Sequence, residues 1–175
     1  ALRVEKFPEQ FLINGTKRYI TNAPIADLFT VFARTNLADL SHKGISAFLI
    51  SKDVPGISAG PEHKKMGQSG SPVSEVFLKD VLASQDDVIG GELGVGFVTA
   101  MKALNKQRIN LAALCIGPAI RMLDEALVHV KKRQQFGRPI AEFQLVQAML
   151  AECKVEIEAA KSLVLETARA RDRGE

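Results

Sequence analysis

The spacing of apolar residues along this chain changes once, near residue 90, and the change divides the sequence into two parts. In the first part, short stretches rich in β-branched and aromatic residues alternate with turn residues, a pattern typical of strands. We expect strands at residues 11–13, 17–21, 27–34, 44–51 and 73–78. Because no long helical pattern separates them, the sequence predicts an antiparallel sheet packed as a barrel or a sandwich.

Two turn signals lie within this first part. Asn14-Gly15 is a dipeptide typical of a tight hairpin, so residues 11–13 and 17–21 are expected to be two strands joined by a turn. Val54-Pro55-Gly56 predicts a second turn, which follows the strand at residues 44–51.

The second part begins at the glycine cluster of residues 90–96 and has a helical period. Apolar residues recur at helical intervals from Phe97 to about Lys132, and an internal proline costs about 3 kcal/mol, so we expect a kink at Gly117-Pro118. Residues 136–139 end this helix. A second helix is expected from near Ala141 almost to the end of the chain. Its apolar seam has alternating gaps of three and four residues and consists of Phe143, Val146, Leu150, Cys153, Ile157, Ala160 and Val164.

The predicted fold class is therefore α+β, with a β domain at residues 1–88 and a helical domain at residues 89–175. Two helices cannot bury such apolar stripes by themselves, and each core side chain left in water forgoes about 1.5–3 kcal/mol. We expect further helices from other parts of the protein or from neighbouring subunits. The chain also starts close to a strand and stops where the seam has barely finished, so it is expected to be part of a longer protein.

Composition excludes several classes of protein. Hydrophobic residues make up 46% and charged residues 25%, as in soluble globular proteins, and no apolar stretch approaches the ~20 residues that span a bilayer. The net charge of +3 is too small and scattered to favour nucleic-acid binding. Cys115 and Cys153 lie among apolar residues and are expected to be buried, reduced thiols. The three histidines have no metal-ligand spacing, so no metal site is expected.

Four segments in the same order resemble the acyl-CoA dehydrogenase family: residues 14–23, 65–81, 94–108 and 133–144. The resemblance implies a homodimer or homotetramer in which FAD lies between a β domain and a helical bundle and reaches the adjacent subunit. It assigns residues 1–88 to most of the middle β domain and residues 89–175 to the first part of the C-terminal helical domain.

The resemblance also implies the residues that bind FAD. It places Tyr19, Ile20 and Thr21 at the flavin, with the Tyr19 ring against the isoalloxazine and Thr21 offering donors near N5 and O4. From spacing alone, Tyr19 and Thr21 share one face of a strand and could be an ordinary aromatic–threonine pair. The family's site for the pyrophosphate and adenine of FAD in the adjacent subunit corresponds to Arg133, Gln135, Phe136, Ile140 and Gln144. Without the resemblance, these residues read as an ordinary helix C-terminus.

The same resemblance places CoA along the first long helix, at Leu104, Asn105 and Arg108. On spacing alone, Arg108 is equally an exposed helix residue. Gln107 stands where some family members carry a catalytic glutamate, and an amide cannot abstract a proton. No catalytic residue is therefore assigned in this chain, and the base is expected beyond residue 175. Gly94 and Gly96 do not indicate a dinucleotide fold, because no βαβ unit precedes them.

The activity implied is FAD-dependent α,β-dehydrogenation of an acyl-CoA thioester, with an electron-transfer flavoprotein as the expected electron acceptor. A bacterial cytoplasm or a mitochondrial matrix is the expected location. Three alternatives keep the fold and change the chemistry: an acyl-CoA oxidase, a flavin monooxygenase and a nitroalkane-oxidase-like relative. A fourth is a non-catalytic oligomerisation or binding module.

Overall fold

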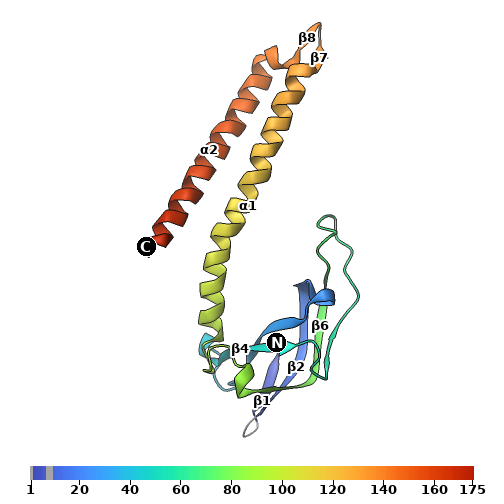
Figure 1. Cartoon of the computed structure of the whole chain (residues 1–175), viewed down its shortest axis with the longest axis vertical. Coiled ribbons are helices and arrows are strands. Elements are labelled where there is room, and N and C mark those ends of the chain that lie inside the picture. Colours follow the sequence, from blue (N-terminus) through green and yellow to red (C-terminus); the bar gives the residue numbers. More distant parts are fainter. Residues whose placement is uncertain (1, 7–9) are drawn as a thin grey trace. The chain divides into compact units, whose positions relative to one another are not determined.

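The computed structural model describes residues 2–6 and 10–175, which form two compact units, residues 1–102 and 103–175. The first unit holds a six-stranded sheet and the start of helix α1, and the second holds the rest of α1, a small hairpin and helix α2 (Figure 1). The predicted α+β class is confirmed. The strands and long helices are β1 (Arg3–Lys6), β2 (Gln10–Thr21), β3 (Leu28–Arg34), β4 (Ile45–Ser51), β5 (Ile57–Ala59), β6 (Val73–Ser84), α1 (Gly96–Lys132), β7 (Gln134–Gln135), β8 (Arg138–Pro139) and α2 (Gln144–Asp172).

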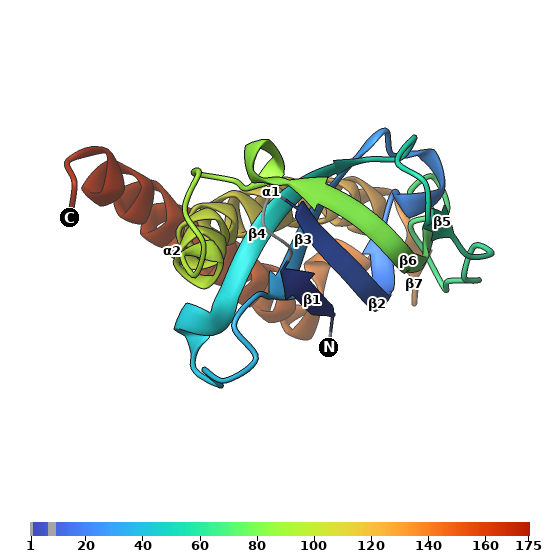
Figure 2. The ribbon, with the colours of Figure 1, turned by 90° about the horizontal axis from the view of Figure 1, so that it is seen from below.

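The sheet of the first unit has the strand order β4-β3-β1-β2-β6-β5, and every pair is antiparallel except β1 with β3 (Figure 2). Among the described residues no ladder joins β4 to β5, so the arrangement fits a sandwich and is not a closed barrel. The core lies on one face of this curved sheet. Its centre is the fully buried Phe48, whose ring meets that of Phe11 edge-on at 5.3 Å.

Strands β2 and β6 form the longest ladder, and it contains two bulges of opposite sense. At the first, Lys79 and Asp80 of β6 oppose the single residue Asn14 of β2, because Ile13 pairs with Val81 and Gly15 with Leu78. At the second, Arg18 and Tyr19 of β2 oppose the single residue Glu75 of β6, because Lys17 pairs with Val76 and Ile20 with Ser74. Asp80 and Tyr19 have positive φ, 54° and 56°.

The bulges explain where the sequence prediction of this region was wrong. Asn14-Gly15 is not a hairpin turn: β2 runs unbroken through it, because the Asn14 side chain bonds to Asp80 in the neighbouring strand. Each bulge also changes which alternate residues face the core. On β6 the buried positions are 74, 76 and 78 before the bulge and 81 and 83 after it. The predicted strand 73–78 therefore stops where the alternation changes, whereas β6 continues to Ser84.

A half-buried lysine bridges β2 to β3, which are separated by the short strand β1. Lys17 Nζ donates a hydrogen bond of 2.8 Å to the carbonyl oxygen of Phe32. Burial lowers the pKa of Lys17, because the charged ammonium loses water on entering this position.

The segment between the sheet and α1 is anchored to the start of β4. The buried Ser46 Oγ accepts a hydrogen bond from Gly94 N at 2.9 Å and lies 2.6 Å from Thr35 Oγ1. A Cβ on Gly96 would lie 2.5 Å from the backbone carbon of Ser46, so only glycine allows this approach. Gly94 and Gly96 thus serve close packing of the helix start on a strand.

In the second unit, α1 and α2 lie side by side and antiparallel (Figure 1). The helical assignment of α1 continues through Gly117 and Pro118, and the kink expected there stays a prediction. α2 begins at Gln144, three residues later than predicted, because residues 140–142 form a 3-10 turn first. Among the described residues, neither helix is long and apolar enough to cross a membrane.

The predicted seam of α2 faces α1. Two hollows of about 300 and 380 Å³ remain between the helices, and the seam residues that line them are Leu150, Cys153, Ile157, Ala160 and Val164. Cys115 and Cys153 are exposed, so their predicted burial was wrong. Each of them lines one of the two hollows, which the side chains of α1 and α2 leave open.

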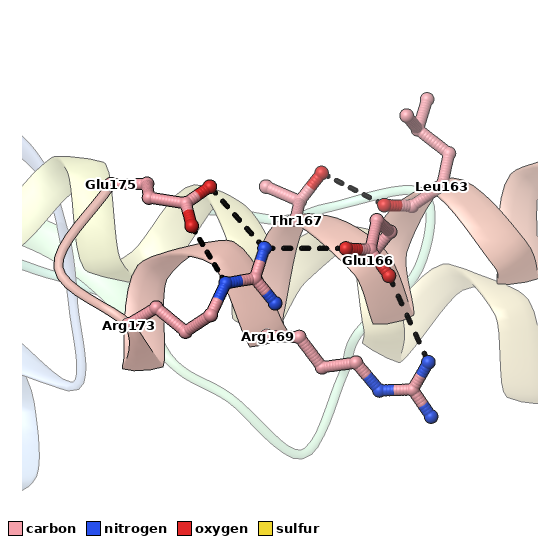
Figure 3. A network of polar contacts seen from close by, with 6 residues as sticks. All are labelled: Leu163, Glu166, Thr167, Arg169, Arg173 and Glu175. Carbon is pink, nitrogen blue, oxygen red and sulfur yellow. Dashed lines mark hydrogen bonds and ion pairs between the residues drawn. The ribbon is translucent and has the colours of Figure 1, made fainter.

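The C-terminal end of α2 carries several exposed ion pairs (Figure 3). Arg173 reaches Glu175 at 2.7 Å and Glu166 at 3.4 Å, and Arg169 lies 3.8 Å from Glu166. Exposed pairs of this kind add little stability, so they mark the helix end without fixing it strongly.

Candidate functional site

Tyr19 lies in the second bulge of β2 and presents its ring to solvent. Its side chain is 68% exposed, and its φ of 56° is unusual for a bulky residue. The Arg18 Cζ atom lies 5.5 Å from the centre of the Tyr19 ring, and Arg18 Nε is paired with Glu75 Oε1 at 2.8 Å. The cross-strand pair therefore holds a cation beside an exposed aromatic ring.

The two neighbours of Tyr19 in the predicted flavin site have different surroundings. Ile20 is half-buried and packs against the core of the first unit, whereas Thr21 is exposed at the end of β2. Tyr19 and Thr21 are thus exposed on either side of the half-buried Ile20.

His63 approaches the Tyr19 ring from the loop between β5 and β6. The two ring centres are 5.5 Å apart. The same loop borders a hollow of about 390 Å³ lined by Glu62, His63, Lys64, Lys65 and Ser69. Within this loop the Lys65 ammonium donates to the carbonyl oxygens of Gln68 and Ser71. Sequence reasoning missed His63, because nothing local links it to Tyr19.

A second group of predicted residues lies on the connection between α1 and α2. Phe136 and Gly137 form a two-residue turn between β7 and β8, and both have positive φ, 53° and 80°, as the I′ class of hairpin requires. Phe136 is 92% exposed at the tip of this hairpin. A ring in such a position is available to a ligand or to another subunit.

Phe143 lies behind the hairpin tip and contacts two of its residues. The Arg138 Cζ atom lies 4.3 Å from the centre of the Phe143 ring, and Phe136 meets the same ring edge-on at 6.2 Å. The exposed Arg133 begins the connection, and its carbonyl oxygen accepts a bond of 2.9 Å from Ile140 N. The hairpin thus combines an exposed aromatic ring with two arginines, a set suited to an aromatic polyanion.

The remaining predicted residues of this group lie on the same connection. Gln135 is exposed in β7, Ile140 is half-buried in the turn that follows β8, and Gln144 is the exposed first residue of α2. Arg138 is a further candidate that the sequence prediction left out, although it lies within the matched segment.

The third group lies on α1. A mainly apolar hollow of about 500 Å³ lies open along one face of α1, and the described residues that border it all belong to this helix: Leu104, Gln107, Arg108, Asn110, Leu111 and Leu114. Leu104 and Arg108 are one helical turn apart and share this hollow, whereas Asn105 is not among the described residues that line it. Among the described residues no group of three or more His, Cys, Asp and Glu is placed to hold a metal ion.

Each part of the chain matches a domain of one and the same family, the middle domain first and the C-terminal domain second. Residues 2–81 match "Acyl-CoA dehydrogenase, middle domain" and residues 94–175 match "Acyl-CoA dehydrogenase, C-terminal domain". The chain belongs to the acyl-CoA dehydrogenase family. The predicted domain boundary after residue 88 falls between the two matched ranges. Its exact position stays a prediction.

Relatives within the acyl-CoA dehydrogenase family match nearly all of this chain. The 3-(aryl)acrylate reductase of Clostridium sporogenes is 42% identical over 167 residues, which are 95% of this chain and 44% of that protein. The cyclohex-1-ene-1-carbonyl-CoA dehydrogenase of Syntrophus aciditrophicus is 39% identical over 162 residues, which are 93% of this chain and 39% of that protein. The chain therefore spans less than half the length of these relatives.

Solved structures of the family have the same fold. Butyryl-CoA dehydrogenase from Megasphaera elsdenii superimposes with a TM-score of 0.92 at 35% identity, over all of this chain and 45% of that one. PigA, solved with FAD and proline, superimposes with a TM-score of 0.95 at 33% identity, over 99% of this chain and 45% of that one.

Proposed function

We propose that this chain supplies the flavin- and CoA-contacting surfaces of an FAD-dependent enzyme that dehydrogenates an acyl-CoA thioester between its α and β carbons. The observation that carries the proposal is that both parts of the chain match acyl-CoA dehydrogenase domains in family order. Relatives named as dehydrogenases of CoA thioesters, and the FAD in the PigA structure, support the substrate class and the cofactor.

The exposed residues fit FAD in their chemistry. An isoalloxazine needs a flat apolar wall and a hydrogen-bond donor, which Tyr19 and Thr21 offer at the end of β2. A pyrophosphate and an adenine need cationic forks and an aromatic face, which Arg133 and the exposed Phe136 offer in the second unit. When bound, FAD supplies the acceptor for the hydrogen that leaves the β carbon as hydride.

The hollow on α1 fits the CoA part of the substrate. Its lining is mainly apolar, with the Arg108 guanidinium at one position, so a pantetheine arm can lie on Leu104 and Leu111 while Arg108 meets a phosphate. We place the base that removes the α-proton outside residues 1–175, since Gln107 carries an amide where a carboxylate is needed. The residues of this chain then bind and orient both reactants and leave the proton transfer to another segment.

The partners belong to the same proposal. Because the hairpin of residues 133–140 is assigned to the FAD of an adjacent subunit, the protein is proposed to be a homodimer or homotetramer. We propose an electron-transfer flavoprotein as electron acceptor and a bacterial cytoplasm or mitochondrial matrix as location. The similarity of this chain to one in a structure described as the electron transferring flavoprotein of Acidaminococcus fermentans supports the first of these.

The proposal is tested by measuring FAD in the protein expressed from its complete gene. We expect absorbance bands of bound flavin, and we expect Arg133→Ala to raise the Kd for FAD about tenfold or more through loss of a charged contact to phosphate. Arg121→Ala is the matched control, since Arg121 is an exposed α1 arginine paired with Glu125. A wild-type protein that takes up no FAD after reconstitution overturns the proposed function.

A further inference from the structure

We infer that His63 is a positioning residue, which fixes the ring of Tyr19 and through it the aromatic wall offered to the flavin. This inference rests on the proposed function. It starts from two locally unfavourable features that lie together: the positive φ of Tyr19 and a buried ring nitrogen of His63 with no hydrogen-bond partner. Such departures from regular structure tend to lie at functional sites.

The position of His63 is set by its backbone. Beyond β5, Gly60 N donates to Glu75 O at 2.9 Å and His63 N donates to Val73 O at 2.8 Å. The chain at residues 60–63 thus continues to pair with β6 along the edge away from β2. Because the second bulge lies opposite Glu75, this pairing brings His63 to Tyr19 from 44 residues along the sequence.

The side chain of His63 gains little for its own stability from this position. Its Nε2 atom is buried without a partner, which costs free energy that an apolar side chain would not lose. Its favourable contact is with the Tyr19 ring, at a centroid distance of 5.5 Å. Arg18, paired with Glu75, provides the second neighbour of the same ring. The exposed Tyr19 ring is therefore held by one cation from its own strand and one ring from another segment.

Two variants separate the ring contact from the histidine chemistry. His63→Ala removes the ring, and His63→Phe keeps an aromatic ring and removes the unpartnered nitrogen. His42→Ala is the matched control, because the His42 ring also lies 5.5 Å from an aromatic ring, that of Phe97, in the same unit. Far-UV circular dichroism first establishes that all three variants are folded.

The first measurement needs no flavin. The sample is the flavin-free protein expressed from its complete gene with ¹³C-labelled tyrosine, and the Tyr19 ring signals in NMR are those that Tyr19→Phe removes. We expect Overhauser contacts between the Tyr19 and His63 rings, signals that move toward random-coil values in His63→Ala, and retention of the shift in His63→Phe and His42→Ala. Unchanged Tyr19 signals in His63→Ala overturn the inference.

The second measurement is the Kd for FAD of the protein expressed from its complete gene. A ring–ring contact of this kind corresponds to about 3- to 10-fold in affinity, so His63→Ala is expected to raise the Kd by that factor, while His63→Phe and His42→Ala stay within about twofold. If Tyr19 moves in His63→Ala but the Kd does not change, the inference is overturned while the proposed function stands. If the wild type binds no FAD, the proposed function falls, and this inference falls with it.

Discussion

Asn14 and Asp80 bind each other reciprocally across the β2–β6 ladder, although 66 residues separate them in sequence. Asn14 Nδ2 donates to Asp80 Oδ1 at 3.1 Å, and Asp80 N donates to Asn14 Oδ1 at 2.8 Å. The pair satisfies the backbone N–H that the first bulge would otherwise leave without a strand partner. The side chain of Asn14 therefore replaces one missing ladder bond.

We expect Asn14→Ala to lower the free energy of unfolding by about 1–2 kcal/mol, because it removes both hydrogen bonds. Urea unfolding followed by circular dichroism measures the change. Asp80→Asn is the control, since its side-chain oxygen still accepts from Asn14 and its backbone N–H is unchanged, so it should unfold close to wild type. Equal urea midpoints for Asn14→Ala and wild type would show that the bulge needs no side-chain support.

Substitution by alanine is expected to change stability in opposite directions at Gly96 and at Gly117. At Gly96 a Cβ would lie 2.5 Å from the backbone carbon of Ser46 and 2.7 Å from Ala47 N, and backbone cannot move aside cheaply. We expect Gly96→Ala to destabilise the chain by about 2 kcal/mol or more, by overpacking the contact between α1 and β4. At Gly117 a Cβ would meet no atom within 4 Å, so Gly117→Ala should stabilise the helix by about 0.5–1 kcal/mol.

Thermal unfolding of the two variants checks this contrast in a single experiment. A lower Tm for Gly96→Ala together with an unchanged or higher Tm for Gly117→Ala is the expected result. If both alanines lower the Tm alike, the close approach at Gly96 is not what makes glycine necessary there.

Lys17→Met should destabilise the first unit by about 1.5 kcal/mol at neutral pH, because the Phe32 carbonyl loses its charged donor. A pH effect accompanies the mutation. Burial lowers the pKa of Lys17, so between that lowered value and 10.5 the unfolded chain binds more protons than the folded chain. Stability contributed by this group therefore rises with pH across that window and is lost as the pH falls through it.

The measurement is the urea midpoint of wild type and Lys17→Met from neutral to alkaline pH. We expect the alkaline rise attributed to Lys17 to be missing in the variant. Lys52→Met removes an equally charged but exposed lysine, paired with Asp27 at 2.5 Å, and should leave the rise in place. Parallel pH curves for wild type and Lys17→Met would contradict the assignment.

Much of the fold follows from local pattern. The strands at residues 28–34 and 45–51 and both long helices lie where runs of β-forming residues and the helical period predict them. These elements are encoded by neighbours within a few residues of each other, so a single sequence contains the required information.

The elements that were missed depend on distant partners. Asn14-Gly15 has the composition of a turn, but its conformation is decided by Asp80 on another strand. The left-handed backbone of Tyr19 is likewise set by its opposition to Glu75, and the approach of His63 by pairing with β6. The resemblance to a family supplied Tyr19 and Phe136 as candidates, whereas their exposure and the Arg18 cation beside the Tyr19 ring are properties of the folded chain.

The two opposed bulges also bear on how this ladder can vary in length. Counted along both strands, the pairing shifts by one residue at Asn14 and returns at Tyr19, so Gln10 with Ser84 and Thr21 with Val73 share one frame. At each bulge two consecutive residues face solvent, Lys79 with Asp80 and Arg18 with Tyr19, so deleting one of the two would leave every side chain beyond it on its present face. Losing Tyr19 and Asp80 together would restore a regular ladder, at the expense of the exposed ring. Each bulge can therefore be lost independently of the other, and of the two only the loss of Tyr19 removes the exposed ring.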